Sequence, residues 1–182
     1  MKKVLLFGGS FDPPHRAHVD IPHEAMKHLG FDEVLYVPAY QSPLKDHVHT
    51  PAKHRLAMLK IALRDKPWAS ISTIELGRKG TSFTIDTIES LQNEDTQLRL
   101  LIGADQWEQF PKWKRYEDII AIADPVIMPR DGFINEDPRV VPIEELPASS
   151  SSIRQFISRG DPINPYVTTE VAQYIAEHNL YQ

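Results

Sequence analysis

Two histidines stand three residues apart in the segment FGGSFDPPHRAH, residues 7–18, which directly follows a short apolar run. Gly8 and Gly9 let the backbone turn tightly and let a ligand approach without a Cβ in the way. His15 and His18 then fall just before and within the first turn of an expected helix, where free backbone N–H groups and the helix dipole favour an anion. The segment therefore predicts a phosphate site with two imidazole donors.

Two other interpretations of this segment stay open on composition alone. Glycines and prolines after a strand often mark only a turn. An H-x-x-H pair can also hold a metal, here with His47 or His49 as further ligands, although no carboxylate stands in a zincin-like pattern with them. The spacing is neither GxGxxG nor GxxxxGK[ST], so it indicates neither a dinucleotide fingerprint nor a P-loop.

A second candidate anion site lies near the other end of the chain, in SSSSIR, residues 149–154. Serines before an apolar-periodic run are typical helix N-caps, and the serines alone predict no more than a helix start. The same helix start would also expose N–H donors and place Arg154 within its first turn. That combination suits a triphosphate.

Short apolar runs rich in Val, Ile and Leu alternate with segments of helical period along the chain. We expect strands at 3–7, 33–37, 69–74, 98–102, 125–128 and 140–143, and helices at 17–29, 51–63, 84–91, 105–122, 150–158 and 168–178. This order predicts an α/β fold, a Rossmann-like open parallel sheet with helices on both faces and a helical C-terminal segment, as one domain over 1–182. Such sheets bind ligands beyond the carboxyl ends of their strands.

Pro22 falls inside the first expected helix. Proline has no N–H, so it cannot donate to the carbonyl of His18, four residues earlier. We therefore expect a bend or an altered first turn at this point of the helix.

Composition narrows the class of protein. The chain has 182 residues, 41% hydrophobic and 25% charged, which is typical of a soluble globular protein. It has no cysteine, which excludes disulfides, thiolate nucleophiles and cysteine-based metal sites. The short N-terminal apolar run stops at Phe7, and no signal-peptide cleavage site follows it. No apolar run is long enough to span a bilayer. We therefore expect a cytoplasmic protein with no membrane partner. The net charge of −5 argues against nucleic acid as a partner, and the sequence leaves a homo-oligomer open.

Both anion segments resemble known signatures. GGSFDPPHRAH resembles GGTFDPPHxGH, the nucleotide-binding signature of the HxGH nucleotidylyltransferases, with Ser10 in place of the usual Thr and Ala17 in place of the usual Gly. SSSSIR resembles the second signature of that superfamily, SSTxIR, with Ser151 in place of Thr. Ser10 keeps the hydroxyl, and Ala17 adds a methyl group where a close approach is usual.

The middle of the chain is similar to one branch of that superfamily. GTSFTIDT, residues 80–87, and GADQWEQFPKW, residues 103–113, resemble the GxSYTxDT and GxDxxxxxxxW segments of bacterial nicotinate mononucleotide adenylyltransferases. With HR at 54–55 and NLY near the end, the similarity covers essentially the whole chain. Other superfamily members act on pantetheine phosphate or on glycerol or choline phosphates, and these two middle segments speak against them.

The resemblance implies an enzyme of NAD biosynthesis that transfers the adenylyl group of ATP to nicotinate mononucleotide, giving nicotinate adenine dinucleotide and pyrophosphate. Mg²⁺ would accompany ATP, with no metal site on the protein itself. The catalytic residues would be His15, His18 and Arg154. The ATP site would comprise Gly8, Gly9, Ser10, Phe11, His15, His18, Gly103, Asp105, Ser150, Ser151, Ile153 and Arg154. The mononucleotide site would comprise Ser10, Lys45, Thr84, Trp113 and Lys114.

Several of these implied roles have a physical sense. A flat, electron-poor pyridinium ring suits the face of Trp113, which could otherwise be a core residue. Backbone N–H groups at Thr84 and Lys114 would meet a carboxylate better than an amide, which favours nicotinate over nicotinamide. Asp105 would accept from a ribose hydroxyl, although a carboxylate there could also be a helix cap.

Lys45 would contact the mononucleotide phosphate. Leu44, beside it, stands where the family pattern usually has a histidine, so one possible phosphate contact is missing.

Two alternatives to the implied activity stay open. One is an adenylyltransferase that accepts both nicotinate and nicotinamide mononucleotides. The other is a non-catalytic ATP-binding sensor, which the retained histidines, Arg154 and Asp105 do not favour.

Overall fold

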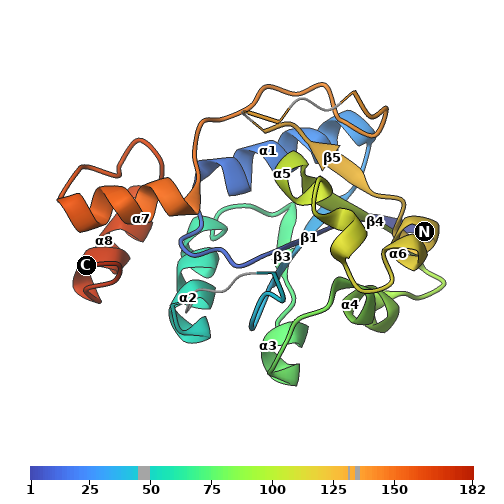
Figure 1. Cartoon of the computed structure of the whole chain (residues 1–182), viewed down its shortest axis with the longest axis horizontal. Coiled ribbons are helices and arrows are strands. Elements are labelled where there is room, and N and C mark those ends of the chain that lie inside the picture. Colours follow the sequence, from blue (N-terminus) through green and yellow to red (C-terminus); the bar gives the residue numbers. More distant parts are fainter. Residues whose placement is uncertain (45–49, 131, 134–135) are drawn as a thin grey trace.

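The structure is a computed structural model that describes residues 1–44, 50–130, 132–133 and 136–182. Its centre is a five-stranded sheet in the order β3-β2-β1-β4-β5 (Figure 1), and every pairing is parallel. The strands are β1 (Lys2–Gly9), β2 (Glu33–Pro38), β3 (Ala69–Ile71), β4 (Thr96–Gly103) and β5 (Val126–Met128). The predicted Rossmann-like α/β fold is confirmed.

Helices cover both faces of this sheet, because successive strand residues point to opposite sides. In β1, Leu5 and Phe7 pack into a core that also takes residues from α1, α2, α7 and α8, whereas Val4 and Leu6 pack into a second core with α4 and α6. The helices are α1 (Arg16–Leu29), α2 (Ala52–Ala62), α3 (Ile74–Arg78), α4 (Thr84–Leu91), α5 (Ala104–Trp107), α6 (Tyr116–Ala123), α7 (Ser150–Arg159) and α8 (Thr169–Glu177), with a 3₁₀ turn, η1 (Phe110–Lys112), between α5 and α6. Helices α7 and α8 form one end of the molecule in Figure 1, opposite the N-terminus.

Three expected elements differ in the structure. The strand expected over 69–74 ends at Ile71, and Ile74 begins α3. The run 140–143 is no strand, and only Val140 makes a bridge, to Ile127. The helix expected over 105–122 is broken into α5, η1 and α6, because Pro111 lies in the 3₁₀ turn and Arg115 is left-handed, with a φ of 54°.

Strand order places the predicted site. The chain leaves β1 through α1 to β2 on one side, and β4 lies against the other side of β1. In sheets of this topology ligands bind beyond the carboxyl ends of the strands, where the strand order reverses. Here that point lies between Gly9 at the end of β1 and Gly103 at the end of β4.

Within the described ranges, no helix is both long and apolar enough to cross a membrane.

Candidate active site

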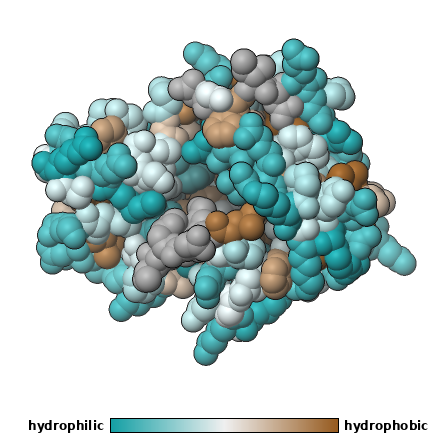
Figure 2. Space-filling model, viewed as in Figure 1, coloured by the Kyte–Doolittle hydropathy of each residue, from teal (hydrophilic) through white to brown (hydrophobic). Residues whose placement is uncertain are grey.

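A cavity of about 380 Å³ lies at this carboxyl edge. The face drawn in Figure 2 is hollowed near its centre, with hydrophilic residues on part of the rim and a hydrophobic group beside the hollow. The sequence-predicted residues that line the cavity come from strand ends, helix starts and the loops between them, near both ends and in the middle of the chain: Gly8, Gly9, Ser10, Phe11, His15, His18, Thr84, Gly103, Asp105, Trp113, Lys114, Ser150, Ser151 and Arg154. The fold therefore brings both predicted anion segments and both middle segments to one place.

Two predicted site residues are not among those lining the cavity. The side chain of Ile153 is fully buried in the hydrophobic core, and its backbone N–H donates to the carbonyl of Ser149 inside α7. Lys45 lies outside the described residues, as do His47 and His49. Leu44, beside Lys45, does line the cavity and is 43% exposed.

His18 is held in one tautomer by its neighbour. The backbone N–H of His15 donates to Nδ1 of His18 at 3.3 Å, so the neutral ring carries its hydrogen on Nε2. The imidazole stacks on that of His15, with ring centroids 3.7 Å apart, and meets the ring of Phe11 edge-on at 5.2 Å. His18 therefore offers the cavity an oriented N–H donor.

His15 is almost completely buried, with 4% of its surface exposed. Burial, together with the nearby positive charge of Arg130, lowers its pKa to about 3. At neutral pH the ring is therefore uncharged in the free protein. An uncharged imidazole can donate one hydrogen bond without introducing a charge of its own.

Three buried side-chain atoms in the described part of the chain have no hydrogen-bond partner: Nδ1 of His15, Oδ1 of Asp105 and Nε1 of Trp113. All three residues line the cavity. Buried polar atoms without partners are rare in proteins and costly to maintain, so their convergence needs a reason. A polar ligand that reaches all three atoms supplies one.

Gly103 makes room for Asp105. A Cβ built on Gly103 would lie 2.6 Å from Oδ1 of that carboxylate, so any larger residue would displace it. Nε of Arg130 lies 3.6 Å from the same oxygen, and Arg130 also lines the cavity. Sequence analysis missed Arg130, although it follows β5 and the strand-end rule applied to the other strands would have found it.

The start of α7 has the caps that its serines predict. The Ser149 hydroxyl accepts from the N–H of Ser152 at 3.1 Å, and the Ser150 hydroxyl donates to the carbonyl of Pro13 at 2.9 Å. Arg154 donates to the carbonyl of Asp12 at 2.6 Å and to the Ser151 hydroxyl at 3.3 Å. The second anion segment is thus tied directly to the loop that carries the first.

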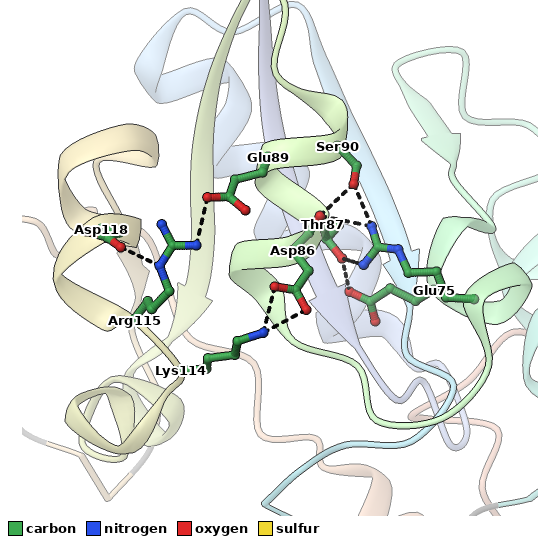
Figure 3. Close-up of polar contacts among 9 residues, drawn as sticks. Glu75, Asp86, Thr87, Glu89, Ser90, Lys114, Arg115 and Asp118 are labelled. Carbon is green, nitrogen blue, oxygen red and sulfur yellow. Dashed lines mark hydrogen bonds and ion pairs between the residues drawn. The ribbon is translucent and has the colours of Figure 1, made fainter.

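Ion pairs join α4 to the loop before α6 (Figure 3). Nζ of Lys114 contacts both oxygens of Asp86, and Arg115 donates to Glu89. Trp113, just before Lys114, and Thr84, at the start of α4, both line the cavity.

A second set of contacts holds α4 from the other side. The Thr87 hydroxyl donates to Glu75 at 2.7 Å, and Arg78 donates to the Thr87 hydroxyl and to the carbonyl of Asp86. Glu75 is buried and lines the cavity, and burial raises the pKa of its carboxyl despite the hydrogen bond from Thr87. Neither Glu75 nor Arg78 was singled out from the sequence, although Glu75 directly follows the strand expected over 69–74 and the strand-end rule would have pointed to it.

Two buried side chains tie the site loops together. Arg55, 1% exposed, donates to the carbonyls of Ser10, Tyr40 and Thr50. Asp12 accepts from the N–H of Thr50 at 3.1 Å and from the Tyr181 hydroxyl at 2.6 Å.

Burial alone would raise the pKa of the Asp12 carboxyl. The hydrogen bonds from Tyr181 and Thr50, with the charge of Arg154, hold it below its usual value instead. Asp12 is therefore a carboxylate at neutral pH, and it accepts in the site loop rather than donating.

Comparison with known proteins gives this arrangement a family. Residues 6–156 match the cytidylyltransferase-like family model. The chain belongs to the cytidylyltransferase-like family. Similar relatives are the probable nicotinate-nucleotide adenylyltransferase of Bacillus pumilus, 35% identical with all of both chains covered, and the nicotinate-nucleotide adenylyltransferase of Bacillus subtilis, 32% identical over the same extent. The resemblance seen in the sequence is therefore confirmed.

Solved structures confirm the fold of this cytidylyltransferase-like chain. The nicotinic acid mononucleotide adenylyltransferase of Plasmodium falciparum, complexed with NaAD, superposes with a TM-score of 0.82 at 21% identity, covering 100% of this chain and 98% of that one.

Ala17, which replaces the usual glycine of the signature, lines the cavity and is 9% exposed. Its methyl group thus forms part of the cavity wall.

Proposed function

We propose that this protein transfers the adenylyl group of ATP to nicotinate mononucleotide, forming nicotinate adenine dinucleotide and pyrophosphate. The observation that carries the proposal is that three buried side-chain atoms without a hydrogen-bond partner belong to residues that line one cavity: His15, Asp105 and Trp113. Full-length relatives that are named nicotinate-nucleotide adenylyltransferases support the choice of reaction.

In this reaction a phosphate oxygen of the mononucleotide attacks the α-phosphorus of ATP. A new P–O bond forms, the bond to the bridging oxygen breaks, and pyrophosphate leaves with the electron pair. The substrate brings its own nucleophile, so the protein has to align the reactants and stabilise negative charge on the phosphate oxygens. The histidine, lysine and arginine side chains that line the cavity supply N–H donors for that purpose.

The N–H donors divide between the phosphate groups. Nε2–H of His18 would donate to the α-phosphate, where charge develops in the transition state. His15 would donate beside it. Ser151, Arg154 and the first-turn amides of α7 would hold the β- and γ-phosphates. Arg130, which the sequence did not suggest, would add a second positive charge near the leaving pyrophosphate.

Mg²⁺ would enter with ATP as part of the substrate. The described residues contain no cluster of three or more His, Cys, Asp or Glu side chains that could hold a metal ion. The donors of the cavity fit a metal that is bound through the triphosphate and water, as Mg²⁺ prefers. The ion would neutralise charge on the phosphates, while the protein supplies the N–H donors.

The mononucleotide would lie at the other end of the cavity. Its pyridinium ring would stack on Trp113, and backbone N–H groups at Thr84 and Lys114 would meet its carboxylate. An amide would turn its own NH₂ toward those donors and leave them unpaired, so the acid should be preferred.

Pyrophosphate release from Mg·ATP tests the proposal, with nicotinate mononucleotide, nicotinamide mononucleotide and phosphopantetheine compared as acceptors. We expect fast turnover with the first and slow turnover with the other two. Similar rates with both pyridine nucleotides would overturn the carboxylate preference alone. Tight ATP binding without turnover on any acceptor would overturn the enzymatic proposal in favour of a sensor.

A further inference from the structure

Helix α1 runs from Arg16 to Leu29 and does not end at Pro22, which lies inside it. Because proline has no N–H, the carbonyl of His18 cannot receive the usual helical hydrogen bond from the residue four positions later. His18 is also the residue whose imidazole would serve the α-phosphate. Its backbone position therefore matters directly to the geometry of the site.

The hydroxyl of Tyr36 takes the place of the missing N–H. It donates to the His18 carbonyl at 2.9 Å from β2, the strand next to β1. Tyr36 is completely buried, and burial raises its pKa well above the usual value, so the hydroxyl stays protonated and donates at any working pH. A buried tyrosine hydroxyl normally needs such a partner.

The ring of Tyr36 is connected to His18 by a second route. Tyr36 pairs in register with Phe7, and the two rings meet edge-on at 5.6 Å. Phe11 lies 5.9 Å from the Tyr36 ring and 5.2 Å from the imidazole of His18. The hydroxyl thus fixes the main chain of His18, while the aromatic rings support its side chain.

We propose that Tyr36 is a positioning residue for catalysis, which holds His18 in register with the α-phosphate by replacing the helical hydrogen bond that Pro22 removes. The proposal rests on the proposed function, in which His18 donates to that phosphate. A purely structural tyrosine would stabilise the core equally well whether or not residue 22 could donate. Residue 22 therefore offers the means to separate the two roles.

Three variants make the separation: Tyr36→Phe, Pro22→Ala and the double variant. Tyr36→Phe keeps the ring and removes the hydroxyl. Pro22→Ala restores an N–H that can donate to the His18 carbonyl, and a carbonyl oxygen can accept two hydrogen bonds, so this variant alone does not compete with Tyr36. Tyr166→Phe is the matched control, since the Tyr166 ring stacks on Phe156, and its link to the start of α1 is a backbone carbonyl that accepts from the N–H of Arg16 and that the variant keeps.

We expect Tyr36→Phe to lower kcat about tenfold and to leave KM for ATP and for the mononucleotide within about twofold, because a displaced donor acts mainly on the transition state. Pro22→Ala alone and Tyr166→Phe should stay within about twofold of the parent protein in kcat. The double variant should recover most of the lost kcat, because the backbone N–H restored at position 22 now supports the same carbonyl.

Unchanged kcat in Tyr36→Phe would overturn the proposal, as would a loss of kcat that Pro22→Ala fails to rescue. Histidine side-chain NMR gives a readout that does not depend on turnover. The His18 ring resonances should move in Tyr36→Phe and return in the double variant, and resonances that do not move would overturn the proposal. If the parent protein turns over no acceptor, the proposed function fails, and the NMR comparison still decides whether Tyr36 positions His18.

Discussion

At the scale of single residues, the two imidazoles have the same chemistry in different settings. His18 is oriented by an N–H bond to its Nδ1, whereas His15 is buried, uncharged and partnerless at its own Nδ1. His18 is suited to a hydrogen bond that strengthens as negative charge develops on the phosphate. His15 has a buried Nδ1 that a bound ligand could pair with.

His18→Ala tests the first setting. We expect kcat to fall about a hundredfold while KM for ATP changes little, because removal of an oriented donor to a developing charge costs mainly transition-state binding. Steady-state kinetics with both substrates measures this. His23→Ala is the control, since His23 lies in the same helix but stacks on Trp68. A higher KM with unchanged kcat would contradict the role.

The buried state of His15 makes the stability of the protein depend on pH. Its pKa is about 3 in the folded protein, against the ordinary histidine value of 6.5 in the unfolded chain, so the unfolded chain binds more protons between these values. Stability from this residue is therefore fully present above pH 6.5 and is lost as the pH falls toward 3.

Urea unfolding of the parent protein and of His15→Gln at about pH 7 and about pH 5.5 measures this dependence. The parent should lose about 1 kcal/mol more than the variant between the two conditions, because one proton contributes at most about 1.4 kcal/mol per pH unit. His54, whose pKa is also lowered, is present in both proteins and cancels from the difference. Parallel losses in both would show that His15 is not buried uncharged.

At the scale of elements, local pattern and tertiary packing divide what the sequence can predict. The apolar runs of β1 and β4 and the serine cap of α7 are encoded within a few residues, so they could be read directly. The break after Trp107 is encoded only in part: Pro111 signals it and the helix expected over 105–122 overlooked that signal, whereas the left-handed Arg115 depends on tertiary packing that no local pattern shows.

That break is what presents Trp113 to the cavity. Trp113→Ala should raise KM for the mononucleotide about tenfold or more and leave KM for ATP nearly unchanged, because a stacking face worth about 1 to 2 kcal/mol is removed from one substrate only. Trp68→Ala is the matched control, since Trp68 stacks on His23. Initial-rate measurements in both substrates decide, and an equal loss for ATP and mononucleotide would make Trp113 structural.

At the scale of the whole molecule, the C-terminal residues contact the loop that follows β1 at the edge of the site. Tyr181 donates to the carboxylate of Asp12, and Arg154 donates to the carbonyl of the same residue. The sequence could not reveal this, because Asp12 and Tyr181 are 169 positions apart and no local pattern links them. The C-terminal residues thus complete the loop that carries both histidines.

Tyr181→Phe should therefore affect function as well as stability. Removal of the hydroxyl leaves a buried carboxylate with one donor fewer, which should cost about 1 to 3 kcal/mol of unfolding free energy. It should also raise KM for ATP several-fold, because Arg154 and the loop of Asp12 share one network. The matched control is Tyr174→Phe, which loses a 2.9 Å hydrogen bond to Nδ1 of His54 between α2 and α8. Urea unfolding should show destabilisation in both variants, and ATP kinetics should change in Tyr181→Phe alone. An equal rise of KM in both variants would mean that the end of the chain contributes only stability.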